Sequence, residues 1–184
     1  MGEGSKKVIF LSHCFINQNA KVLEFARYPG VVAPFLDFMK RKGYAVEQLP
    51  CPETLHMGIK RWWNTKELYD TPGFRKHCRR LAKHVVDLME HYQRKGYDVV
   101  LIGLDGSPSC GVNITGRNPN WGGRPYASIE DYHIVEEMGV WMEELKAEIE
   151  RRGVKLANMT GVPMDDPKFN MDESLRNIEK LVEG

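Results

Sequence analysis

Residues 98–104 give the strongest strand signal of the chain, with the sequence DVVLIGL. Only Asp98, at the start of this run, is charged, so apolar side chains occupy both faces of the strand that it predicts. A strand buried on both faces is typical of a parallel sheet that helices cover on either side. The segment therefore favours an α/β fold.

Three further strands and four helices are expected around this segment. The strands are predicted at residues 8–12, 45–49 and 154–159, and the helices at residues 31–42, 74–94, 128–152 and 172–182. The helix at 74–94 shows apolar residues at steps of three and four, and a glycine follows its end. The order β-α-β-α-β-α-β-α predicts a single-domain Rossmann-like three-layer fold with a mostly parallel sheet, spanning residues 1–184.

The charge balance argues against some classes of partner. Lys and Arg total 26 and Asp and Glu total 25, so the net charge is +1 and no extended surface for a nucleic-acid polymer is expected. No stretch approaches the roughly 18 apolar residues of a membrane span, and the apolar run at 8–11 is too short for a signal peptide. We expect a cytoplasmic protein whose cysteines are free, metal-bound or catalytic.

Three of the four cysteines each follow a different predicted strand. Cys14, Cys51 and Cys110 stand at these positions, in turns rich in Pro, Gly and Ser. Parallel strands bring their carboxyl ends to one edge of the sheet, so we expect the three thiols to converge there. Three thiolates suit either a zinc ion with a water or an iron–sulfur cluster with one iron free of protein ligands. Separate buried thiols are the alternative, and Cys78, inside a predicted helix, is interpreted in that way.

The segments after the first three strands are long and are predicted to be irregular; they are residues 13–29, 51–72 and 105–127. Loops of this length in a compact domain are usually functional. In the second of them Glu53 is a candidate general base, or else a capping or surface carboxylate. In the third, Ser107 and Ser109 are candidates for hydrogen bonds to sulfur or substrate, or for backbone caps. Asp105 predicts a turn, and His13 is more often structural in such a position.

Several motifs of these segments, taken together, resemble those of the TudS family of thiouracil desulfurases and related desulfidases. The motifs are a strand that ends in Cys14, RYPG at 27–30, CPE at 51–53 and SPSCG at 107–111. The resemblance implies a 4Fe-4S cluster with three cysteine ligands, Cys14, Cys51 and Cys110, and one open iron. It also implies that Glu53 is the catalytic acid or base and that Ser107 is the active-site serine.

The resemblance implies a non-redox hydrolysis of a C–S bond. The expected enzyme is an iron–sulfur-dependent desulfidase that removes sulfur from a small thiocarbonyl compound, such as a thiolated nucleobase or nucleotide, and releases hydrogen sulfide. Two alternatives stay open: a sulfur transferase that carries sulfide on the same cluster, and a non-catalytic zinc- or cluster-binding protein. The segments that follow the three cysteines depart from the usual family pattern, so contacts to the substrate are expected to differ.

Two groups of cationic and aromatic residues stand in these divergent segments; they are Lys60, Arg61, Trp62 and Trp63, and Arg117, Trp121 and Arg124. Such pairs are suited to stack on a planar ring and to neutralise a carboxylate or phosphate of a small molecule. The alternative interpretation is that these side chains anchor their loops to the body of the domain.

Overall fold

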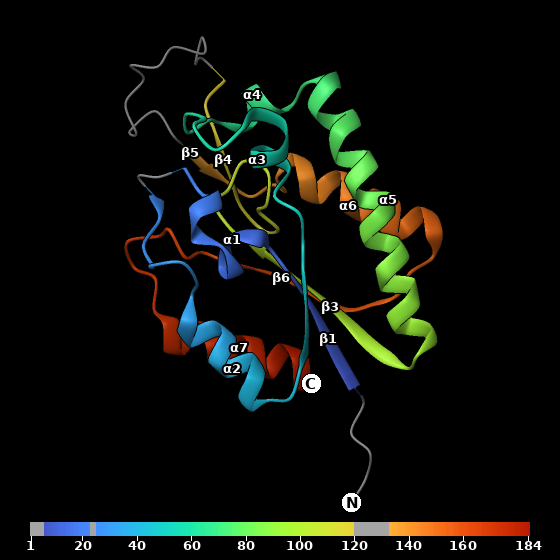
Figure 1. The fold of residues 1–184 in the computed structure, drawn as a ribbon. Coiled ribbons are helices and arrows are strands. Elements are labelled where there is room, and N and C mark those ends of the chain that lie inside the picture. The colour runs from blue at the N-terminus through green and yellow to red at the C-terminus, as the bar shows by residue number, and fades with distance from the viewer. Residues whose placement is uncertain (1–5, 23–24, 120–132) are drawn as a thin grey trace, which may run out of the picture.

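A four-stranded parallel sheet with the strand order β2-β1-β3-β6 forms the centre of the computed structural model (Figure 1). The structure describes residues 6–22, 25–119 and 133–184. The strands are β1 (Lys6–Leu11), β2 (Ala45–Gln48), β3 (Tyr97–Leu104) and β6 (Leu156–Val162). This architecture confirms the predicted α/β fold. A short antiparallel pair, β4 (Thr115–Arg117) and β5 (His133–Val135), stands apart from the sheet.

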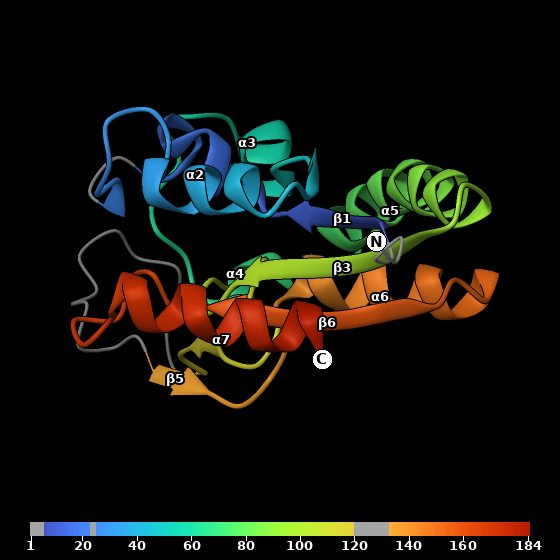
Figure 2. The same cartoon turned by 90° about the horizontal axis from the view of Figure 1, so that it is seen from below.

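Helices cover both faces of the sheet (Figures 1 and 2). The pair α5 (Pro72–Arg94) and α6 (Val140–Arg152) lies on one face, and α2 (Ala33–Arg41) and α7 (Met171–Glu183) lie on the other. Successive residues of a strand point to opposite faces, and β1 divides accordingly. Val8 and Phe10 pack toward α5 and α6, whereas Ile9 and Leu11 pack toward α2 and α7.

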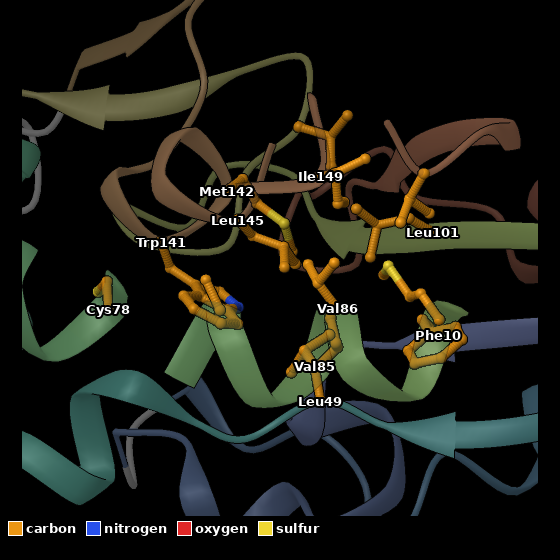
Figure 3. Close-up of a cluster of buried hydrophobic side chains, with 14 of the residues drawn as sticks. Phe10, Leu49, Cys78, Val85, Val86, Leu101, Trp141, Met142, Leu145 and Ile149 are labelled. Atoms are coloured by element: carbon orange, nitrogen blue, oxygen red, sulfur yellow. The ribbon is translucent and has the colours of Figure 1, made fainter. Parts of the chain in front are cut away.

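The core beneath α5 and α6 contains the fourth cysteine (Figure 3). Cys78 is fully buried in this apolar cluster, where Trp141 of α6 is the largest buried side chain. The interpretation of Cys78 as a packing residue agrees with this position. Helix α5 itself begins where the Thr71 hydroxyl accepts a hydrogen bond from the Phe74 amide at 3.2 Å, with Pro72 in its first turn.

The helix predicted at 128–152 is wrong in its first half. Helix α6 begins at Val140, while His133–Val135 form strand β5 and residues 128–132 lie outside the described part. Two features explain the difference. Ile134 and Val135 are β-branched residues that pair with β4. Gly139 packs so tightly that an added Cβ would lie 2.4 Å from the Ser109 backbone, so the chain enters α6 from an extended residue.

Other predicted boundaries also shift. The last strand ends at Val162 and not at residue 159, because β6 continues in register with β3 up to the pair of Leu104 and Val162. The segments predicted as irregular contain short helices: α1 (His13–Ile16), η1 (Gln18–Ala20), α3 (Pro52–Met57) and α4 (Lys66–Tyr69). Short helices of one or two turns carry too little periodicity to be read from sequence. Within the described residues, no helix is both long and apolar enough to span a membrane.

Candidate active site

A cavity of about 550 Å³ opens at the carboxyl edge of the sheet, and three cysteines line it. Cys14 lies in α1 directly after β1, Cys51 is the N-cap of α3 after β2, and Cys110 lies in the turn after β3. All three are partly buried and none forms a disulfide. The structure therefore brings to one cavity three residues that are 37 and 59 positions apart in the sequence.

The three thiols influence one another electrostatically. Burial raises the pKa of the Cys14 thiol to about 12; Lys21 opposes this effect and Cys51 adds to it. Burial likewise raises the pKa of Cys110 far above its ordinary value, and Cys51 and Cys14 raise it further. These mutual effects on ionisation agree with the position of the three thiols, which line one cavity.

Local backbone geometry fixes two of the thiols. The Cys51 Sγ accepts a hydrogen bond from the Thr54 amide at 3.4 Å, so the cysteine caps α3 in the way that a serine caps other helices. The Ser107 Oγ accepts a hydrogen bond from the Cys110 amide at 3.1 Å. Ser107 thus shapes the turn that carries Cys110, and it also lines the cavity.

The side chain of Asp105 stabilises the turn that carries Cys110. Its buried carboxylate accepts hydrogen bonds from the amides of Val112 and Asn113, both at 2.9 Å, and from the Asn113 side chain at 2.8 Å. Gly161 of β6 makes room for it, because a Cβ at that position would lie 2.0 Å from Asp105 Oδ1. The Asp105-Gly106 pair signals the turn in the sequence, but not this anchoring role.

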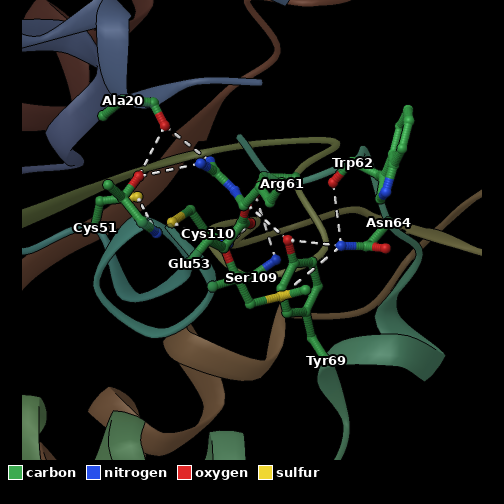
Figure 4. A network of polar contacts seen from close by, with 12 residues as sticks. Ala20, Cys51, Glu53, Arg61, Trp62, Asn64, Tyr69, Ser109 and Cys110 are labelled. Carbon is green, nitrogen blue, oxygen red and sulfur yellow. Dashed lines mark hydrogen bonds and ion pairs between the residues drawn. The ribbon is translucent and has the colours of Figure 1, made fainter. Parts of the chain in front are cut away.

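Glu53 is a buried carboxylate in the first turn of α3 (Figure 4). Its Oε2 accepts hydrogen bonds from Arg61 Nε at 2.8 Å and from the Tyr69 hydroxyl at 3.0 Å. Its Oε1 accepts a hydrogen bond from the Ser109 hydroxyl at 2.5 Å. The alternative of a surface carboxylate is therefore wrong. No sequence motif marks Tyr69 as part of this site, because α4 brings it to Glu53 from 16 residues away.

Arg61 is bonded to protein acceptors on all sides. Besides Glu53, it donates to Ala20 O at 2.8 Å, to Thr54 Oγ1 at 3.1 Å and to Gly58 O at 3.4 Å. Burial by itself would lower the pKa of Arg61, but the charge and hydrogen bond of Glu53, together with the nearby Cys51 and Tyr69, raise it. Four of the five N–H groups of a guanidinium are thereby used, so the predicted role of Arg61 in binding a substrate anion is not what this geometry favours.

The other predicted cationic and aromatic residues are dispersed. Trp63 lines the cavity, whereas the Trp62 side chain is 68% exposed. Arg117 forms ion pairs of 2.8 Å with Glu67 and with Glu137, and so joins β4 to its neighbours. Trp121 and Arg124 lie outside the described residues. Of the two groups of cationic and aromatic residues, the described members that line the cavity are Arg61 and Trp63.

The remaining wall of the cavity is largely apolar but also contains several charged side chains. Phe25, Ile114 and Ile134 are among its apolar side chains. Of the charged side chains, Lys21 pairs with Asp165, and Arg27 Nη2 donates to Asp165 O at 2.8 Å. His13 also lines the cavity, and its Nδ1 lies 2.7 Å from the Gln48 side chain, next to the end of β2.

Comparison with known proteins identifies the family. Residues 36–166 match the family described as "Putative 2-thiouracil desulfurase". The chain belongs to this family, the TudS family, as its motifs had predicted. It is 26% identical over 177 residues to the uncharacterized protein MJ0003 of Methanocaldococcus jannaschii, a match that covers 96% of this chain and 97% of that protein. A solved structure described as a 4Fe-4S-dependent thiouracil desulfidase, TudS, matches with a TM-score of 0.49 and 20% identity over 92% of this chain and 99% of that one.

Proposed function

We propose that this protein is an iron–sulfur-dependent desulfidase, which converts a small thiocarbonyl compound and water into the carbonyl compound and hydrogen sulfide. One observation carries the proposal: Cys14, Cys51, Cys110 and the buried Glu53 all line the same cavity. Membership of the 2-thiouracil desulfurase family supports it. The reaction exchanges sulfur for oxygen at one carbon and needs neither an oxidant nor a reductant.

Cys14, Cys51 and Cys110 would hold a 4Fe-4S cluster. Thiolate sulfur is the usual protein ligand of such clusters. A single zinc ion needs ligands that reach one point, and no three His, Cys, Asp or Glu side chains within 6–22, 25–119 and 133–184 gather in that way. When bound, a cluster with three cysteine ligands would supply a Lewis-acidic iron with affinity for sulfur.

Glu53 would act as the general base at the carbon atom. It accepts a proton from water as the water oxygen forms a bond to the thiocarbonyl carbon. When the C–S bond breaks, Glu53 returns this proton to sulfur, and the new hydroxyl gives up the second proton of the water as it becomes the carbonyl, so that sulfur leaves as hydrogen sulfide. Ser107, at the cavity wall, would orient the water or the substrate through its hydroxyl hydrogen, since its oxygen already accepts the Cys110 amide.

The charges of the cavity favour an uncharged thiolated base over a nucleotide. Each cationic side chain of Lys or Arg among the described lining residues already contacts protein acceptors, with Arg61 on Glu53 and Lys21 on Asp165. The carboxylates of Asp105 and Asp166 line the cavity as well. A phosphate would have to displace these partners, whereas a flat neutral ring fits the apolar wall.

Glu53→Gln tests the assigned base. The amide keeps the size of the side chain but cannot take a proton, so turnover is expected to fall by about 10²–10⁴-fold. Iron content and visible absorbance should stay at the wild-type level. Release of hydrogen sulfide from thiouracil and related thiobases is the measurement. Unchanged turnover in E53Q would show that Glu53 is not the base.

Metal analysis tests the cofactor. After anaerobic purification we expect about four iron atoms with acid-labile sulfide per chain. Cys51→Ala should lose the visible absorbance of the cluster, whereas Cys78→Ala, the control, should keep it. One zinc per chain and no iron would overturn the proposal. Incorporation of labelled sulfide into a product would show sulfur transfer in the opposite direction.

A further inference from the structure

The two carboxylate oxygens of Glu53 have different surroundings. Two side chains donate to Oε2, namely Arg61 from the segment after α3 and Tyr69 from α4. Among the residues that the structure describes, the Ser109 hydroxyl is the one donor to Oε1. A carboxylate oxygen has two lone pairs, so Oε2 is saturated while Oε1 keeps one acceptor site.

Arg61 connects the two segments that carry the first two cysteines. Its Nη2 donates to Ala20 O, in the segment that follows Cys14. Its Nη1 donates to Thr54 Oγ1, in the helix that Cys51 caps, and the Thr54 hydroxyl also donates to Ala20 O at 3.0 Å. The side chain is only 3% exposed. The guanidinium is thus a buried brace between α3 and the chain that follows α1.

Tyr69 is fixed from its other side. Its hydroxyl accepts a hydrogen bond from Asn64 Nδ2 at 3.2 Å, which directs the hydroxyl hydrogen toward Glu53 (Figure 4). Burial and then the charge of Glu53 raise the pKa of Tyr69, so its hydroxyl remains a donor at neutral pH. Arg61 and Tyr69 therefore hold one oxygen of the carboxylate from two directions.

We propose that Arg61 and Tyr69 are positioning residues, which occupy Glu53 Oε2 and thereby leave Oε1 as the oxygen that exchanges the proton with water. The inference rests on the proposed function. Neither residue needs to touch the substrate. Each acts by stopping rotation of the carboxylate, and a misplacement of about 1 Å is enough to cost about 10²-fold in rate.

Arg61→Lys and Tyr69→Phe test the inference in the holoenzyme. Lysine keeps the charge but loses the planar set of donors, and phenylalanine removes one hydroxyl only. We expect kcat to fall about 10–100-fold in R61K and about 3–10-fold in Y69F, with KM within about twofold of wild type. In Y69F, visible absorbance and iron content should stay at the wild-type level, because the Tyr69 hydroxyl bonds to Glu53 and Asn64 and not to a proposed ligand. The kcat of R61K is expressed per bound cluster, because Arg61 also braces the segments that follow Cys14 and Cys51.

Two matched controls are available on α5 and α6. The Tyr92 hydroxyl bonds to Glu47 at 2.6 Å, and Arg152 pairs with Glu90 at 2.5 Å, both outside the cavity lining. Y92F and R152K should leave kcat at the wild-type value. A wild-type kcat in Y69F, or an equal loss in Y92F, would overturn the inference. If R61K does not fold, Y69F and its control carry the kinetic test.

A thermal double-mutant cycle in the metal-free protein separates this inference from the proposed function. If Arg61 acts through Glu53, E53Q and R61K together should lower Tm by clearly less than the sum of the two single changes. If the Tm of the double variant falls by the sum of the two single changes, the inference is overturned, whether or not the protein has desulfidase activity. A non-additive cycle in a protein without desulfidase activity would instead overturn the proposed function and the catalytic role of the pair with it.

Discussion

Cys78 and Cys110 carry the same side chain in very different surroundings. Cys78 projects from α5 into an apolar cluster with Trp141, and it is fully buried there (Figure 3). Cys110 shares a cavity with two other thiols and lies 3.4 Å from the Ser109 hydroxyl. The position of Cys78 suits packing, and the position of Cys110 suits ligation of a metal centre. Substitution of the two residues should therefore have different effects.

Cys78→Ala is expected to lower the free energy of unfolding by about 1–2 kcal/mol, because it leaves a small void in a well-packed core. Iron content per folded chain should not change. Urea unfolding and iron analysis of the same preparation check both parts. A loss of iron in C78A would assign the cluster four cysteines and contradict the ligand set proposed above.

Some residues of this site could be predicted from the sequence, whereas their contacts could not. The cysteines and Glu53 stand in short motifs, CPE and SPSCG, and could be selected from these alone. The partners of Glu53 could not, because the contact with Ser109 joins positions 56 residues apart. Arg61 had two interpretations, a contact with an anionic substrate or an anchor for its own loop, and its bonds to Glu53 and Ala20 favour the second. The charge of Arg61 is evident from the sequence, but its partner depends on tertiary structure.

Among the elements, α4 is joined to β4 and to the residue that follows β4 by the carboxylate of Glu67. Glu67 accepts hydrogen bonds from Arg117 Nε at 2.8 Å and from the Asn118 amide at 3.0 Å. Burial by itself would raise the pKa of Glu67, but these donors hold it at about 2, below the ordinary value of 4.5. The ionised carboxylate therefore stabilises the fold above pH 4.5, and this contribution is lost as the pH falls toward 2.

Glu67→Gln should lower the free energy of unfolding at pH 7 by about 1–2 kcal/mol. The difference in the free energy of unfolding between E67Q and wild type should become smaller between about pH 5 and pH 2, because wild type also loses the ionised carboxylate in this range. Urea unfolding at a series of pH values measures it. Glu150→Gln is the control, since its 67%-exposed side chain lies 3.8 Å from Lys146 and should contribute little. A difference in the free energy of unfolding that becomes larger in acid would contradict the stabilising role of the ionised Glu67.

The contact between β6 and the turn after β3 gives a second test at this scale. Gly161→Ala should push the Asp105 carboxylate off the amides of Val112 and Asn113, because the new Cβ would lie 2.0 Å from Oδ1. We expect a lower Tm and a lower iron content on reconstitution. Gly73→Ala, where nothing lies within 4 Å of the added Cβ, should leave both unchanged. Equal effects of the two changes would disprove the anchoring role of Asp105.

For the whole molecule, the fold was easier to predict than the cavity. The strand at 98–104 and the alternation around it were sufficient to predict a parallel sheet with helices on both faces. Segment boundaries failed where tertiary contacts decide them, as at Gly139, whose extended backbone packs against Ser109. The short helices α3 and α4 were missed for a different reason, because helices of one or two turns carry too little periodicity to be predicted from sequence.

Loading the cluster should stabilise the three cysteine segments together. Each follows a different strand, so a group bound to all three would link parts of the chain that otherwise open separately. We expect hydrogen exchange to slow in segments 13–20, 51–58 and 105–113 on reconstitution, and Tm to rise. Helix α7, which contributes no side chain to the cavity, is the internal control. Protection of only one segment would contradict a shared ligand set.

Parallel strands that all run toward one edge have a consequence for how such a family can diverge. The cavity wall consists mainly of chain that has already left the sheet, whereas β1 and β3 stay paired from Lys6 and Tyr97 to Leu11 and Ile102. Insertions or deletions after Cys14 or Cys51 thus remodel the wall without shifting the strand register. A change in loop length can therefore alter the shape of the cavity while the strands that present the thiols keep their positions.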